Sequence, residues 1–424
     1  MRYTSTRDSS ISCSFEEALC SGYAPDGGLF VPEQLPTIGI RILQEWSLLT
    51  RVSDLAFNVL RHFIAPQEIS DEELKCICQE SYPIDVPVRN IVSKNKETSS
   101  FFLVELFHGP TFCFKDLGLR PVVAMLSHFA KKKKKENEGA QKQQSIHLLV
   151  ATTGDTGPAA VHAVQMVNDP SISIVVHYPQ GQISAFQRKQ LTTVISPQVQ
   201  IVTFQGGGDD MDKPIQNILK TNGLQGDSKE KDQQILVCGV NSYNIGRPLM
   251  QMIHYIWTYL RVIEQMNLPL DSPLDIIVPT GAMGNLASGY MVKQMGIPIN
   301  TLTASVNIND ITHRTVQTGK FYKSPVMKRT LSEAINIQYP YNFERILYYL
   351  TNGNNILVKE WMSTYHYSDQ EQQKLDIPSE WLSKLQSDFQ TSRVTDEELC
   401  ETIRIIKAVH DIVIDPHTAV AVKG

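Results

Sequence analysis

The sequence has few cysteines, no long apolar run and no excess of basic residues. Seven cysteines in 424 residues are too few and too scattered for a disulfide framework, which indicates a reducing, intracellular setting. No segment approaches the run of about 18 apolar residues that spans a bilayer, and the start has no apolar signal core. With 39 basic against 44 acidic side chains, the chain lacks the positive field of a nucleic-acid or anionic-membrane binder. These absences favour a cytoplasmic protein with a small-molecule partner, although the Ser-rich start is also compatible with an organelle signal.

The length predicts two or three domains. Apolar residues recur at three- and four-residue spacing between residues 15 and 75, which predicts a helical N-terminal domain over residues 1–90. From about residue 91 to 424, short apolar runs alternate with helical patterns, so we expect an α/β catalytic domain built on a doubly wound parallel sheet. Its predicted strands are 101–106, 146–151, 172–176, 201–204, 235–238 and 274–278. The polar stretches 131–144 and 223–234 are interpreted as loops, the first beginning as a solvated helix end.

Four segments place unusual residues directly after an apolar run that we interpret as a strand. In open α/β sheets, ligands bind at the carboxyl ends of the strands. The segments are 105–116, 151–160, 278–287 and 415–420. The pair Cys76 and Cys78 is interpreted as packing, because a zinc site needs four ligands and no second pair follows, so no metal site is predicted.

Lys115 is the reactive candidate of the first segment. It follows a Gly-Pro turn and is flanked by Phe112, Cys113 and Phe114. An apolar setting disfavours the ammonium form and makes a neutral amine available to form an imine with a carbonyl compound. The other interpretation is an ordinary surface lysine.

The next two segments are candidate anion loops. Residues 151–160 (Ala-Thr-Thr-Gly-Asp-Thr-Gly-Pro-Ala-Ala) combine glycines and hydroxyls before a helix expected near Pro158, whose positive end would face an anion. Residues 278–287 (Val-Pro-Thr-Gly-Ala-Met-Gly-Asn-Leu-Ala) suggest a cup of backbone amides, although the lysine of a P-loop is absent. An ordinary helix cap is the competing interpretation of each. The fourth segment, Asp415-Pro-His-Thr418, is by itself only a helix start.

Together and in this order, these segments resemble threonine synthase, a member of the pyridoxal-phosphate (PLP) fold type II group that includes the tryptophan synthase β chain. Further matching motifs are Tyr3-Thr-Ser-Thr-Arg7, 22–32, His108-Gly-Pro-Thr, Phe186-Gln-Arg-Lys-Gln190, Asn241-Ser242 with Arg247 and Gln251, 306–311 with His313-Arg314, and Asn342-Phe-Glu-Arg345. The resemblance covers essentially the whole chain.

The resemblance implies a role for each site residue. Lys115 would bear PLP as a Schiff base and shuttle protons, and Thr418 would face the pyridine nitrogen. The cofactor phosphate would be held by Gly281, Ala282, Met283, Gly284 and Asn285. The substrate carboxylate would be received by Thr152, Thr153, Gly154, Asp155, Thr156 and Gly157. Arg247 is a candidate for the substrate phosphate, since its planar guanidinium suits that dianion, and a structural ion pair is its equally weighted alternative.

The chain departs from the usual threonine synthase pattern at a few positions. Ala282 and Met283 replace an Asn-Phe pair, Ile245 replaces Trp or Pro, Gln180 replaces Lys and Tyr341 replaces Ser. Such loops resemble the metazoan threonine synthase-like 2 proteins, described as catabolic phospho-lyases. The resemblance therefore implies a carbon–oxygen lyase that eliminates phosphate from O-phosphothreonine or O-phosphohomoserine, giving 2-oxobutyrate, ammonia and phosphate. A threonine synthase that makes threonine from O-phosphohomoserine is the alternative.

A third interpretation comes from the end of the chain. Gly424 lies shortly after the Asp415 turn, whereas the family continues for several further elements, so we expect a truncated catalytic domain. The alternative from another functional class is then a shortened protein that is non-catalytic or acts in signalling. The intact Phe114-Lys115-Asp116 motif argues against this alternative. The oligomeric state does not follow from the sequence.

Overall fold

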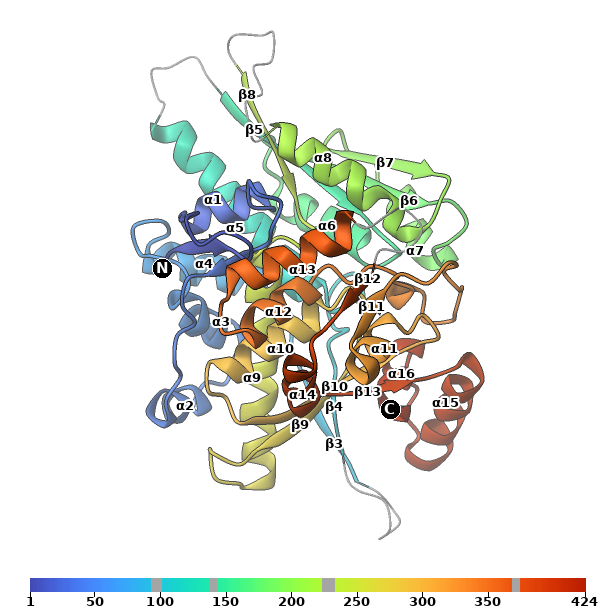
Figure 1. Cartoon of the computed structure of the whole chain (residues 1–424). Coiled ribbons are helices and arrows are strands. Elements are labelled where there is room, and N and C mark those ends of the chain that lie inside the picture. Colours follow the sequence, from blue (N-terminus) through green and yellow to red (C-terminus); the bar gives the residue numbers. More distant parts are fainter. Residues whose placement is uncertain (93–100, 137–142, 223–232, 368–373) are drawn as a thin grey trace. The chain divides into compact units, whose positions relative to one another are not determined.

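The computed structural model describes residues 1–92, 101–136, 143–222, 233–367 and 374–424 (Figure 1). The chain divides into two compact units, each assembled from separate segments. The first unit comprises Met1–Gln34, Thr50–Asp85 and Leu106–Ile253, and the second comprises Leu35–Leu49, Val86–Glu105 and His254–Gly424. The predicted domains 1–90 and 91–424 stay a prediction. Within the described ranges, no helix is both long and apolar enough to cross a membrane.

The first unit contains a parallel sheet in the order β7-β6-β5-β8. Its strands are β5 (Gln143–Ala151), β6 (Ile172–Pro179), β7 (Val199–Phe204) and β8 (Gln233–Gly239). The register sets Ala151 opposite His177 and Leu149 opposite Gly239. Because the strands are parallel, their carboxyl ends share one edge, and the candidate loop after Ala151 starts at that edge. Four of the predicted strands are thus confirmed as neighbours in one sheet.

Helices and two short strands complete the first unit. They are β1 (Tyr3–Ser5), α1 (Phe15–Ser21), β2 (Phe30–Pro32), α3 (Val52–Arg61), α4 (Asp71–Ser81), α5 (Asp116–Glu136), α6 (Thr156–Val167), α7 (Ala185–Thr192), η1 (Gly208–Met211), α8 (Asp212–Asn222) and the start of α9 (Gly246–Met266). Capping boxes fix the starts of α1 and α4, where Ser14 pairs with Glu17 and Ser70 with Glu73. The helical character of residues 15–75 is confirmed, and the apolar positions that predicted it are largely buried.

The basic run after residue 130 belongs to α5. Its lysines lie in the last turn, where positive charge is favourable to the helix dipole, and Asp116 lies in the first turn. The predicted helix end is therefore confirmed as far as Glu136, and β5 already begins at Gln143. Residues 137–142 and 223–232, which complete the two predicted loops, lie outside the described residues.

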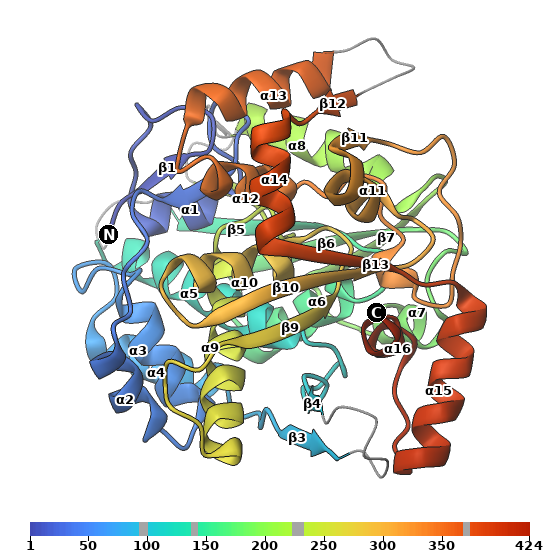
Figure 2. The same cartoon turned by 60° about the horizontal axis from the view of Figure 1, so that its bottom comes forward.

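The second unit contains a separate parallel sheet in the order β13-β10-β9. Its strands are β9 (Leu274–Pro279), β10 (Ile299–Val306) and β13 (Phe389–Arg393), which Figure 2 shows side by side. Only β9 was predicted from the sequence. The predicted α/β class with parallel strands is confirmed, and the described parallel strands form two sheets, one in each unit.

Two of the predicted strand positions differ from the structure. Residues 101–104 form β4 (Phe101–Val104), but β4 pairs antiparallel with β3 (Val88–Ile91) and belongs to neither parallel sheet. Residues 412–414 are not a strand. The argument from the carboxyl ends of parallel strands therefore holds for the segments after β5 and β9, and is wrong for those containing Lys115 and Thr418.

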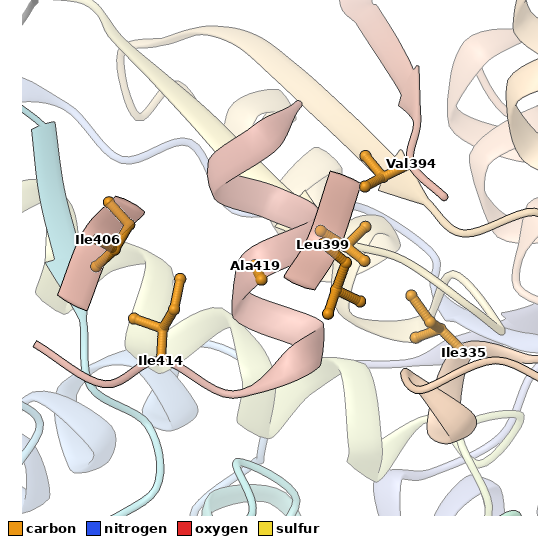
Figure 3. Close-up of a cluster of buried hydrophobic side chains, with 7 residues drawn as sticks. Ile335, Val394, Leu399, Ile406, Ile414 and Ala419 are labelled. Carbon is orange, nitrogen blue, oxygen red and sulfur yellow. The ribbon is translucent and has the colours of Figure 1, made fainter. Parts of the chain in front are cut away.

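The remaining elements of the second unit surround its sheet and a core cluster. They are α2 (Ile40–Ser47), α10 (Gly284–Gln294), α11 (Ile311–Thr318), β11 (Lys320–Tyr322), η2 (Glu333–Ile335), α12 (Phe343–Leu350), α13 (Asn355–Tyr367), β12 (Lys374–Asp376), α14 (Ser379–Asp388), α15 (Asp396–His410) and α16 (Pro416–Lys423). Figure 3 shows Ile335 of η2 grouped with Leu399 of α15 and Ala419 of α16, all of them buried. This cluster fixes η2, which borders the predicted phosphate loop.

A buried polar network joins the end of β10 to the residues on both sides of η2. The Asn307 Nδ2 atom lies within hydrogen-bonding distance of Thr330 Oγ1 (2.9 Å), Ser332 Oγ (3.0 Å) and Asn336 Oδ1 (2.8 Å), and these oxygens share its two protons. Asn309 donates to the same Asn336 oxygen at 3.0 Å. Because unpaired buried polar atoms are costly, the closed network specifies one path for residues 324–338.

We expect Asn307→Leu to destabilise the protein by about 2–4 kcal/mol, because its buried partners lose their donor. The matched control is Asn300→Leu, since Asn300 is exposed and its amide contacts only Asp275. Urea unfolding of both variants measures the difference. A loss no larger than that of the control would contradict the structural role of the network.

Candidate active site

The residues predicted for the site fall into two groups. Lys115, residues 152–157 and Arg247 belong to the first unit, whereas residues 281–285 and Thr418 belong to the second.

Lys115 lies just before α5, and its side chain is only 15% exposed. Its Nζ atom is 3.3 Å from Asp155 Oδ2 and 5.8 Å from the centre of the Phe114 ring. Phe112, which was expected to shield the lysine, is 65% exposed. The expected apolar setting is thus corrected: the amine has one aromatic neighbour and one carboxylate partner.

Asp155 pairs with this lysine and does not cap α6, the helix at whose start it lies. It occupies the N-cap position of α6 but makes no side-chain cap hydrogen bond. Its other oxygen, Oδ1, accepts a hydrogen bond from Gln187 Nε2, and Gln187 follows the Ser184 cap of α7. Sequence reasoning missed the role of Gln187, although the motif 186–190 that contains it was noted. The carboxylate therefore holds the Lys115 amine from a position that α7 supports.

The loop 152–157 is shaped by its own first threonine. Thr152 Oγ1 accepts hydrogen bonds from the N–H groups of Gly154 and Gly157, each at 3.0 Å. Gly154 has a φ of 136°, and a Cβ there would lie 2.1 Å from Gln187 Oε1, so only glycine fits. Thr152 Oγ1 thereby accepts two hydrogen bonds within the loop and keeps its own hydroxyl proton. The substrate-carboxylate role of residues 152–157 stays a prediction.

The residues flanking Lys115 have structural roles. Asp116 is fully buried, and its carboxylate accepts the Thr111 N–H at 2.9 Å and the Thr111 hydroxyl at 2.8 Å. Burial raises the pKa of Asp116, while the Thr111 hydrogen bonds act in the opposite direction. Burial also raises the pKa of the Cys113 thiol, which disfavours a thiolate nucleophile. The reactive role of Lys115 itself stays a prediction.

Arg247 is 1% exposed at the start of α9. Its Nη1 donates to the Val240 carbonyl at 3.0 Å, and its Nε atom would lie 3.3 Å from a Cβ placed on Gly118. The first contact ties the start of α9 to the segment after β8, and the second places Arg247 against α5. The substrate-phosphate role of Arg247 stays a prediction.

In the second unit, the start of α10 presents a run of unused backbone donors. Among the described residues, nothing accepts a hydrogen bond from the N–H groups of residues 281–286, and the N-cap residue Met283 provides no side-chain cap. The capping boxes of α1, α4 and α15 show how other helices of this chain satisfy such groups. Since buried N–H groups need a partner and a helix N-terminus favours negative charge, residues 281–286 (the anion loop) fit a phosphate.

Contacts on both sides fix the anion loop. A Cβ on Gly281 would lie 3.0 Å from Ile335 Cα, so the loop passes closely against η2. On the other side, the Asn285 side-chain oxygen is 2.9 Å from His254 Nε2, and its carbonyl accepts the Tyr255 hydroxyl at 2.9 Å. Both α9 residues are buried. Sequence reasoning missed His254 and Tyr255, because nothing in the local sequence marks them.

Thr418 occupies the first turn of α16, where Asp415 is the N-cap. Burial acts to raise the pKa of Asp415, but hydrogen bonds from His417 and Thr418 and the charge of His417 lower it to about 2. Because the carboxylate is ionised, the Thr418 hydroxyl at 2.5 Å donates its only proton to Asp415. In this rotamer, Thr418 could only accept a hydrogen bond from a pyridine nitrogen.

The residues that depart from the synthase pattern lie in different settings. Ala282 and Met283 belong to the anion loop, where the Ala282 carbonyl accepts the Asn342 N–H at 3.4 Å. Gln180 follows β6 and accepts a hydrogen bond from Gln205. Ile245 is fully buried, so its side chain packs in the core of the first unit. The replacement of Trp or Pro by Ile245 therefore changes the packing of this core.

Comparisons with known proteins agree with these features. The family model for the threonine synthase N terminus matches residues 2–82. The chain is 36% identical to Xenopus laevis threonine synthase-like 2, covering 100% of this chain and 83% of the relative. It is 35% identical to Saccharomyces cerevisiae threonine synthase, with 99% and 82% covered.

Solved structures give the same assignment. The crystal structure of yeast threonine synthase matches with a TM-score of 0.84 and 33% identity, covering 100% of this chain and 82% of that one. The PLP-bound threonine synthase from Brucella melitensis matches with a TM-score of 0.82 and 27% identity, with 100% and 84% covered. The fold is that of the PLP fold type II enzymes. The chain belongs to the threonine synthase family.

The setting of His254 generates a prediction about pH. Burial lowers the pKa of His254 from 6.5 to about 4, although the contact with Asn285 raises it. Between these values the unfolded chain binds a proton that the folded chain excludes, so stability falls as the pH decreases from 6.5 to 4. We expect His254→Gln to lose less stability over this window, by on the order of 3 kcal/mol.

Urea unfolding at the two ends of the window measures this difference. Thr258→Val is the matched control, because it removes a buried hydroxyl one turn along α9 and no titratable group. An identical pH dependence in the wild type and His254→Gln would contradict the buried, neutral state of His254.

Proposed function

We propose that this chain is a PLP-dependent lyase that releases phosphate from O-phosphothreonine or O-phosphohomoserine and yields 2-oxobutyrate and ammonia. Either substrate consumes one water molecule in this overall reaction. Family membership supports the cofactor, since the Brucella melitensis relative is described as PLP-bound. The observation that carries the proposal is the Lys115 amine, which is largely buried and held 3.3 Å from Asp155.

The residues of both units have complementary roles in this proposal. Lys115 would hold the cofactor's aldehyde end, and the N–H groups of the anion loop would hold its phosphate. When bound, PLP would supply an electron sink that acidifies the substrate's Cα–H bond. The Lys115 amine is the base that would take the Cα proton, and Asp155 would orient it. The loop formed by residues 152–157 is the proposed binding site of the substrate carboxylate.

Elimination is favoured over threonine synthesis by the chemistry that each needs. Loss of phosphate from Cβ requires one deprotonation at Cα, whereas loss from Cγ followed by water addition needs further proton transfers at Cβ from positioned groups. Ala282 and Met283 place apolar side chains in the anion loop where the usual pattern has an amide. Threonine synthase activity is the second candidate, supported by the 35% identity to the yeast enzyme.

We expect purified protein loaded with PLP to be yellow, and borohydride reduction to fix the cofactor on Lys115. Lys115→Ala should lose both signals, because no amine remains at that position. Peptide mapping by mass spectrometry identifies the modified lysine. Lys189→Ala, which changes a lysine in α7, is the control. Reduced cofactor on a different lysine in the wild type would overturn the assignment.

We expect O-phosphothreonine to give phosphate, ammonia and 2-oxobutyrate in equal amounts. O-phosphohomoserine should give little threonine, because the positioned groups for water addition at Cβ are not provided. Both phosphorylated amino acids are incubated separately, and threonine, 2-oxobutyrate and phosphate are measured together, with Lys115→Ala as the blank. Threonine as the main product from O-phosphohomoserine would establish the synthase instead.

A further inference from the structure

The second unit contains a buried histidine that no part of the proposed reaction uses. His254 of α9 is 5% exposed and stacks on Tyr255, with ring centres 4.9 Å apart. Its Nε2 atom lies 2.9 Å from Asn285 Oδ1. Since that oxygen can only accept, Nε2 carries a proton. Burial lowers the pKa of His254, which favours the neutral imidazole.

This contact determines which way the Asn285 amide faces. An amide has one accepting and one donating end, and the hydrogen bond from His254 fixes the accepting end toward α9. The Nδ2 group then faces away from His254, and among the described residues none accepts its protons. Asn285 is the second residue of α10, in the anion loop. Its spare donors therefore belong to the same helix start as the unused backbone N–H groups.

Tyr255 restrains the backbone of the same residue. Its hydroxyl donates to the Asn285 carbonyl at 2.9 Å. Its ring also packs against α10, because a Cβ on Gly289 would lie 2.7 Å from Tyr255 Cε1. Two neighbouring residues of α9 thus hold Asn285, one through the side chain and one through the main chain, which limits its rotation.

We propose that His254 is a positioning residue that presents the Asn285 amide as a donor to the cofactor phosphate. The inference rests on the proposed function, since it assumes that the anion loop receives that phosphate. Without the His254 donor, the Asn285 amide can turn over and bring its oxygen toward the anion. The phosphate would then face the amide oxygen, which repels it, and would lose the Nδ2 group, which can donate a hydrogen bond.

The test compares two probes, PLP and pyridoxal, which lacks the phosphate. We expect His254→Leu to weaken PLP binding by roughly tenfold or more, as for the loss of one hydrogen bond to a charged group, and to leave pyridoxal binding unchanged. His254→Gln, which can return an N–H donor, should restore PLP affinity. His254→Phe retains an aromatic ring but has no donor, so it should behave like His254→Leu. The test needs only one of these two variants to fold.

Two further variants separate positioning from stability. Thr258→Val alters the same helix without touching Asn285, and should leave the ratio of PLP to pyridoxal affinity unchanged. In an Asn285→Ala background, His254→Leu should have no additional effect on PLP affinity, because the amide that it orients is absent.

Equal weakening of PLP and pyridoxal binding by His254→Leu, or no rescue by His254→Gln, would overturn the positioning role. Failure of the proposed function has a different signature. In that case the wild type itself would bind PLP no better than pyridoxal, or would not be labelled on Lys115 after borohydride reduction.

Discussion

The second unit depends on one constraint. The backbone N–H groups at the start of α10 have no hydrogen-bond acceptor among the described residues. A Cβ on Gly281 would lie 3.0 Å from Ile335 Cα, and Met283 provides no side-chain cap. The buried network of Asn307 supports η2, and the cluster in Figure 3 anchors it from the other side. The packing of this unit thereby preserves a preformed anion loop, which costs little reorganisation when a phosphate binds.

In the first unit, the comparable feature is a carboxylate at a helix N-cap that does not cap the helix. Asp155 stands at the N-cap of α6 but makes no cap hydrogen bond, and its two oxygens contact Lys115 and Gln187 instead. Thr152 compensates by accepting the N–H groups of Gly154 and Gly157. The loop thus keeps its internal hydrogen bonds while its acid pairs with the Lys115 amine, the group proposed to transfer protons.

Local patterns predicted the reactive segments but not the contacts between them. Lys115 and the two glycine loops were found because their residue types are unusual and ordered as in a known family. The pairing of Lys115 with Asp155 and of His254 with Asn285 joins residues 40 and 31 positions apart, so no local period reports it. β10 was missed because its Thr- and Asn-containing sequence has no continuous apolar run, and β4 was assigned to the wrong sheet because strand pairing is decided by tertiary context.

The most direct test of the account is a crystal structure of the PLP-loaded protein. The account predicts phosphate oxygens within hydrogen-bonding distance of the N–H groups of residues 281–286 and of Asn285 Nδ2, with the cofactor joined to Lys115 Nζ. Phosphate bound at residues 152–157, or a cofactor attached to another lysine, would contradict it.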